Sequence, residues 1–163
     1  MSEPDQRYAK FTSQEIRTAY HEAGHAVVCL VLGLRIERVT IVPDDESFGS
    51  TYYRKSSKNT RDIEEVILSC AGSVGEILLL HHPGEIQALT LELFQDIVGR
   101  EVFNSVSKME LEDQRAFECW NIARDIIASC AGAVMTIADA LLARKILSGD
   151  EVQSLWEAST QET

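Results

Sequence analysis

The chain has 163 residues, of which 45% are hydrophobic, and a formal net charge of -11. This length can bury one apolar core, while the acidic balance argues against nucleic-acid binding, because phosphates are neutralised by lysine and arginine. No apolar run approaches the roughly 20 residues that span a bilayer, and the polar N-terminus is unlike a signal peptide. The four cysteines form no CxxC pair, which is typical of reduced thiols, so we expect a cytoplasmic protein.

A helix is predicted from about residue 12 to residue 33. Thr12 can cap its N-terminus, and Glu15, three residues later, can complete a capping box. Apolar residues then recur at helical spacing until Gly33, a residue typical of helix C-termini. The helix therefore carries the stretch AYHEAGHAVV, which places two histidines and a glutamate in an otherwise apolar run.

The remaining elements follow in chain order. A β-branched run that ends at a proline predicts a strand over 38–43, and the stretch GSTYYR predicts a second strand over 49–54. The pattern beyond residue 59 is helical, with segments over 60–81, about 86–107, 111–145 with a break near Ala131 and Gly132, and a short last helix after residue 150.

These elements predict a mainly α (α+β) fold. A small β-sheet or hairpin is inserted after the HEAGH helix, and helices make up the rest of the chain. We expect residues 1–11 to form a flexible arm, residues 12–158 to form a single domain, and residues 159–163 to form a tail.

The HEAGH motif has the spacing of a metal site. His21 and His25 are four residues apart, so on a helix their side chains point the same way and can bind one Zn²⁺, leaving positions for a third protein ligand and a water. Glu22 follows the first ligand, and its carboxylate can take a proton from the metal-activated water. The alternative is a core helix with structural histidines; the scarcity of histidine and the helical context favour the metal site.

The chain resembles the peptidase domain of the membrane-bound AAA+ zinc proteases of the FtsH type, peptidase family M41. The resemblance extends from about residue 12 to residue 155. It is carried, in chain order, by AYHEAGHAVV at 19–28, VTIVP at 39–43, FGST at 48–51, CAGSVGE at 70–76, IADALL at 137–142 and LSGDEV at 147–152. The resemblance implies a helical M41-like peptidase domain with zinc as its cofactor.

The same resemblance suggests a third zinc ligand. In the family this ligand is an aspartate at the start of a later helix, and Asp96 lies at a similar separation from the first histidine. The approach to Asp96 departs from the family, since Leu91-Glu92-Leu93-Phe94 replaces small residues and Gln95 replaces an asparagine. Glu92 and Glu76 are therefore kept as substitutes, although Glu76 suits a partner of a histidine better than a direct ligand.

The function expected from these features is that of a zinc-dependent metalloendopeptidase. His21, His25 and Asp96 would bind the metal, and Glu22 would be the general base that activates water for attack on a peptide bond. One of the two strands would offer an edge to an extended peptide or unfolded polypeptide, and the resemblance points to the second strand, at 49–54.

Two further expectations concern what the chain lacks. It has no GxxxxGK[ST] phosphate loop, so cleavage by this chain is expected to be independent of ATP. Besides the substrate, the expected partners are further copies of this chain or a separate protein that delivers substrate. The divergent approach to Asp96 supports an alternative, a catalytically inactive or regulatory peptide-binding module that retains the M41 fold.

Overall fold

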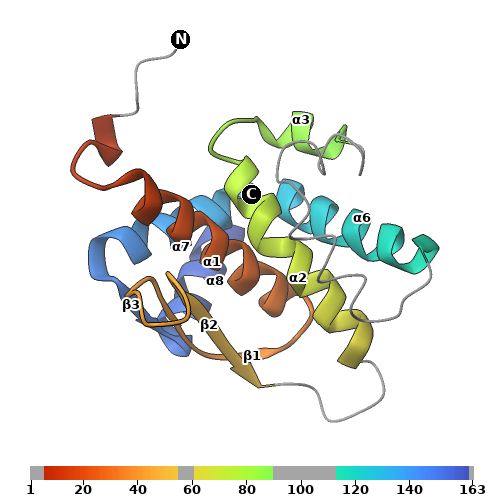
Figure 1. Ribbon diagram of the computed structural model, residues 1–163, viewed down its shortest axis with the longest axis horizontal. Coiled ribbons are helices and arrows are strands. Elements are labelled where there is room, and N and C mark those ends of the chain that lie inside the picture. Colours follow the sequence, from red (N-terminus) through yellow and green to blue (C-terminus); the bar gives the residue numbers. More distant parts are fainter. Residues whose placement is uncertain (1–5, 55–60, 90–112, 162–163) are drawn as a thin grey trace.

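The computed structural model describes residues 6–54, 61–89 and 113–161 (Figure 1). Its elements, in chain order, are η1 (Gln6–Tyr8), α1 (Ser13–Val31), β1 (Arg35–Thr40), β2 (Ser50–Arg54), α2 (Arg61–Ile77), α3 (Pro83–Gln87), α6 (Asp113–Ser129), α7 (Ala131–Arg144), β3 (Ile146–Ser148) and α8 (Gly149–Gln161). The predicted mainly α fold with a small sheet is confirmed.

Helix α1 lies at the centre of the molecule. It packs against α2 on one side and against α7 on another (Figure 1). Its apolar stripe, which includes Ala19, Ala23 and Val27, is fully buried. The predicted capping box is present, since Thr12 accepts a hydrogen bond from the Glu15 backbone while the Glu15 carboxylate accepts one from the Thr12 backbone. The apolar period and the cap together fix the position of the HEAGH helix.

Helices α1 and α2 approach each other closely through glycines. A Cβ placed on Gly24 would lie 2.5 Å from the carbonyl oxygen of Ala71, and one on Gly75 would lie 2.5 Å from the carbonyl oxygen of Tyr20. Side chains at these two positions would force the helices apart, since real Cβ atoms do not make contacts this short. The small residues of α2 therefore bring its backbone against the helix that carries the two histidines.

The sheet has the order β2-β1-β3, with both pairs antiparallel. Strand β1 is central, and its Val39 lies opposite Thr51 of β2 and Leu147 of β3. Strand β2 is therefore an edge strand in the described part of the chain. Strand β3 was absent from the sequence prediction, because three residues between two helices are too few to show an alternating pattern.

Several element boundaries differ from their predictions. The first strand spans Arg35–Thr40 rather than 38–43, and α2 ends at Ile77 rather than at residue 81. The predicted break near Ala131 and Gly132 is confirmed, since the segment over 111–145 contains two helices, α6 and α7, which are separated at Cys130 and bent by 77°. No single helix in the described ranges is long and apolar enough to span a bilayer. The bent pair α6 and α7 is long and apolar enough only when the two helices are taken together.

Candidate active site

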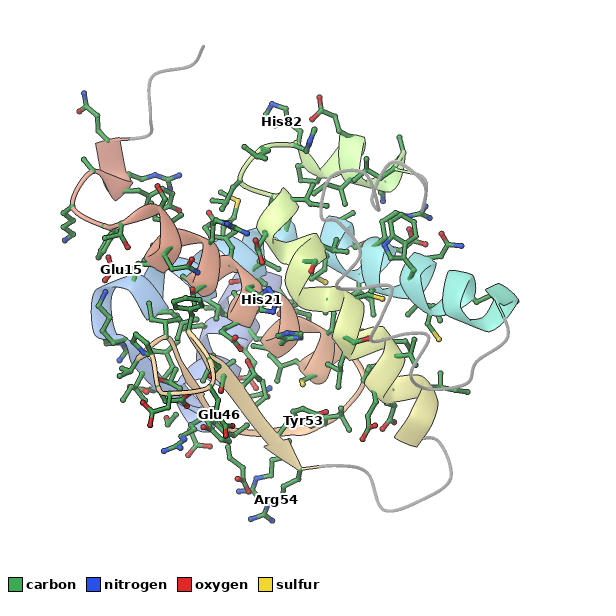
Figure 2. The ribbon with its side chains drawn as sticks, in the orientation of Figure 1. Glu15, His21, Glu46, Tyr53, Arg54 and His82 are labelled. Atoms are coloured by element: carbon green, nitrogen blue, oxygen red, sulfur yellow. The ribbon has the colours of Figure 1, made fainter. Side chains whose placement is uncertain are left out.

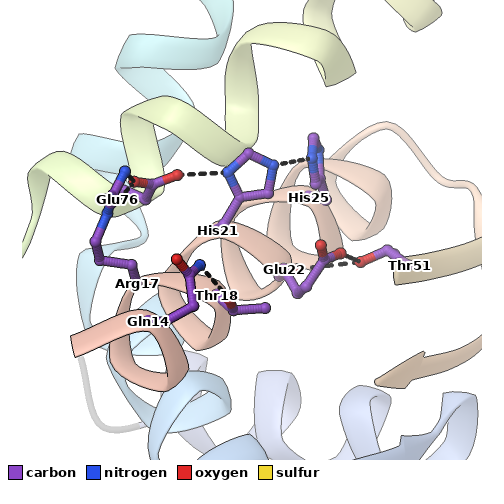
Figure 3. A network of polar contacts seen from close by, with 8 residues as sticks. All are labelled: Gln14, Arg17, Thr18, His21, Glu22, His25, Thr51 and Glu76. Carbon is purple, nitrogen blue, oxygen red and sulfur yellow. Dashed lines mark hydrogen bonds and ion pairs between the residues drawn. The ribbon is translucent and has the colours of Figure 1, made fainter. Parts of the chain in front are cut away.

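The structure brings five side chains from three elements together around the HEAGH motif (Figure 3). Helix α1 supplies His21, Glu22 and His25, helix α2 supplies Glu76, and strand β2 supplies Thr51. Figure 2 shows His21 where α1 and α2 lie side by side.

The two histidines face each other through their Nε2 atoms, which are 3.0 Å apart. The ring planes are inclined by 76°. Two nitrogens that each bind one tetrahedral zinc ion at 2.0–2.1 Å lie about 3.3 Å apart, so this separation suits a shared ion. Burial and, to a smaller extent, the nearby His21 lower the pKa of His25 to about 3. His25 is therefore neutral at pH 7, which is the form that binds a metal.

The orientation of His21 is fixed by an acid on the neighbouring helix. Its Nδ1 lies 2.7 Å from Oε1 of Glu76, and the other carboxylate oxygen accepts hydrogen bonds from Nε and Nη2 of Arg17 at 3.1 and 3.0 Å. Burial raises the pKa of Glu76, but the bonds from His21 and Arg17 outweigh burial and lower it overall. An ionised Glu76 can accept the Nδ1 proton of His21, and in that tautomer Nε2 is the nitrogen that can bind a metal.

The His21 ring occupies a space that exists because residue 72 is glycine. A Cβ on Gly72 would overlap the imidazole, with Cε1 only 2.5 Å away. Any larger residue here would displace the ring from Glu76 and from His25. The backbone of α2 thus supports the ring on one side while Glu76 supports it at Nδ1.

Glu22 points toward Thr51 of strand β2 (Figure 3). Only 5% of the residue is exposed. Its Oε2 accepts a hydrogen bond of 2.7 Å from the hydroxyl of Thr51. Burial raises the pKa of the Glu22 carboxyl, while the Thr51 hydrogen bond and the nearby His21 act against that rise. A carboxyl with a raised pKa is suited to accept and return a proton near neutral pH.

Pockets flank His21 and Glu22 on two sides. One, of about 300 Å³, extends toward the start of α1 and includes Arg17 and Phe48, whereas the other, of about 430 Å³, extends along β2 toward Tyr53. Both are lined by His21, Glu22 and Gly49. The motif therefore lies in the middle of an open depression rather than at its closed end.

The predicted third ligand cannot be placed. Asp96 and its substitute Glu92 lie outside the described residues, so both stay predictions. The other substitute, Glu76, is described, and its carboxylate contacts Nδ1 of His21. Within the ranges that the structure describes, no three residues among histidine, cysteine, aspartate and glutamate are arranged to hold an ion. The two histidines thus supply part of a donor set that one further ligand would complete.

Sequence reasoning missed the contributions of Thr51, Arg17 and Gly72. Thr51 and Arg17 lie in stretches whose composition is ordinary for a strand and a helix, so no local pattern marks them. Gly72 lies within the stretch CAGSVG, whose small residues were the one available signal that another helix packs closely there.

Comparisons with known proteins point to metallopeptidases. A family model described as Peptidase M50B-like matches residues 7–81, which include α1, β1, β2 and α2. The chain is 27% identical to the ATP-dependent zinc metalloprotease FtsH 1 of Symbiobacterium thermophilum, over 98% of this chain and 32% of that protein. It is 24% identical to the ATP-dependent zinc metalloprotease FtsH 2 of Thermoanaerobacter sp., over 85% of this chain and 32% of that protein.

The chain is related to zinc metallopeptidases. A shorter match to the ATP-dependent zinc metalloprotease FtsH of Syntrophus aciditrophicus is 51% identical but covers 25% of this chain and 6% of that protein. The chain spans about a third of the length of the first two metalloproteases.

Replacing Glu76 by alanine should weaken zinc binding by about 10- to 100-fold, the usual effect of losing the partner that orients a metal-binding histidine. Zinc affinity would be measured by competition with a chromogenic chelator. Glu37→Ala is the matched control, because Glu37 also bonds an arginine, Arg54, but on the exposed face of the sheet away from the motif. Equal zinc affinity in wild type and Glu76→Ala would show that Glu76 does not support the site.

Proposed function

We propose that the chain is a zinc-dependent metalloendopeptidase of the M41 type. The observation that carries this proposal is the arrangement of the HEAGH motif: two imidazole nitrogens 3.0 Å apart, with the buried carboxyl of Glu22 on the same helix. The relationship to zinc metallopeptidases supports the same chemistry.

His21 and His25 would hold the zinc ion through Nε2, and Asp96 is the proposed third ligand. When bound, the ion would polarise the scissile carbonyl and lower the pKa of water. As the oxygen of the water bonds to the carbonyl carbon, Glu22 accepts a proton from that water. Glu22 then donates this proton to the leaving nitrogen as the peptide C–N bond breaks, which restores the carboxylate for the next cycle.

The substrate proposed for this site is an extended peptide or an unfolded polypeptide segment. Strand β2 is the edge of the sheet in the described residues, and its free side can pair with an added strand through main-chain hydrogen bonds. The pockets on two sides of Glu22 leave room for chain on both sides of the scissile bond. This openness favours internal cleavage over removal of a terminal residue.

The test is cleavage of unfolded casein and of a quenched fluorescent peptide by the zinc-loaded protein, without ATP. We expect cleavage that stops when a chelator removes the metal and returns when zinc is added. Cleavage that persists after complete removal of zinc would contradict the proposal. A protein that binds both zinc and peptide but cleaves neither substrate would instead be a peptide-binding module.

A further inference from the structure

The carboxylate of Glu22 is held by a residue from the edge strand. Thr51 Oγ1 donates a hydrogen bond of 2.7 Å to Glu22 Oε2 and lies 3.3 Å from the Glu22 carbonyl oxygen (Figure 3). A hydroxyl has one proton, so the shorter contact, to the carboxylate, is the stronger bond. Thr51 thereby engages one of the two carboxylate oxygens and leaves Oε1 for proton transfer.

The contact depends on how closely the chain before β2 approaches α1. A Cβ on Gly49 would lie 2.7 Å from Cγ2 of Thr18 and 3.0 Å from Cγ of Glu22. Only a glycine leaves space for this approach. Two residues further on, Thr51 is fixed by its pairing with the fully buried Val39 on the central strand. The hydroxyl therefore reaches Glu22 from a rigid backbone rather than from a mobile loop.

We propose that Thr51 is a positioning residue that holds the Glu22 carboxylate in the orientation needed for proton transfer, and so couples the edge strand to the general base. The inference rests on the proposed function. Because β2 is also the strand to which a peptide would add, the residue that orients the base and the backbone that aligns the scissile bond belong to one rigid element.

Thr51→Val and Thr51→Ser separate this role from simple packing. Valine keeps the shape and removes the hydroxyl, whereas serine keeps the hydroxyl. We expect Thr51→Val to lower kcat by about 10- to 100-fold with KM and zinc affinity nearly unchanged, because a displaced catalytic group costs rate rather than binding. Thr51→Ser should retain most of the wild-type kcat. Thr40→Val, which removes a hydroxyl from the neighbouring strand β1, is the matched control and should leave kcat unchanged.

The contact itself is tested without any activity measurement. Urea unfolding of the metal-free wild type, Thr51→Val, Glu22→Leu and the double variant forms a double-mutant cycle. We expect Thr51→Val to reduce the folding equilibrium constant about fivefold in the wild type and to have little effect when Glu22 is leucine.

The outcomes are distinct. Additive effects in the cycle, or a Thr51→Val variant with wild-type kcat, would overturn the role of Thr51 alone. Equal losses in Thr51→Val and Thr51→Ser would also overturn it, since the hydroxyl would not be the group that matters. If the zinc-loaded wild type cleaves no peptide at all, the proposed function fails, and the role of Thr51 in positioning a general base fails with it even where the cycle shows coupling.

Discussion

Replacing Glu22 by glutamine should lower kcat for peptide cleavage by about 100- to 10,000-fold while zinc remains bound. Glutamine has nearly the shape of glutamate, and its amide oxygen can still accept the hydrogen bond from Thr51. It cannot take a proton from water at neutral pH, so the loss falls on the chemical step rather than on the fold.

The measurement is a steady-state assay with a quenched fluorescent peptide, together with zinc content by elemental analysis and the unfolding midpoint in urea. The variant should keep both zinc and stability, because removing the charge of a carboxyl that is only 5% exposed leaves no unpaired charge in the interior. Wild-type kcat in Glu22→Gln would mean that another group is the base, and would remove Glu22 from the proposed chemistry.

Replacing His25 by alanine should abolish stoichiometric zinc binding. Loss of a residue that orients a ligand costs 10- to 100-fold in metal affinity, so loss of the ligand itself should cost more than about 100-fold. We do not expect Cys29, one turn further along α1, to replace His25 as a ligand, because Cys29 is buried in the core and its pKa is raised to about 12.

Zinc content after dialysis against trace metal, measured on wild type and His25→Ala, checks this expectation. We expect one zinc per wild-type chain and almost none in the variant, with similar far-ultraviolet circular dichroism for both. His82→Ala is the control, because His82 lies at the start of α3 rather than on α1. Equal zinc content in wild type and His25→Ala would place the metal elsewhere.

The HEAGH helix could be predicted from sequence because its determinants are local. The cap at Thr12, the apolar period and the spacing of His21 and His25 all lie within 21 residues of one another, and the structure confirms the helix that they predicted. The face shared by two residues at i and i+4 follows from helix geometry alone.

The support around the motif could not be predicted in the same way. Glu76 and Thr51 are 55 and 29 residues from the side chains that they contact, His21 and Glu22. Such partners are set by how α2 and β2 pack on α1, and the run of small residues in α2 signals only that a close contact exists, not which side chains meet there. The third ligand was a prediction from resemblance and stays one, because Asp96 lies outside the described residues.

Zinc K-edge X-ray absorption of the protein loaded with one zinc would identify the side chains that hold the metal. We predict a first shell of nitrogen and oxygen at about 2.0–2.1 Å, with the outer-shell scattering of two imidazoles. A sulfur shell at about 2.3 Å, or a first shell without imidazole, would show that the metal is not held by His21 and His25 and would contradict the account.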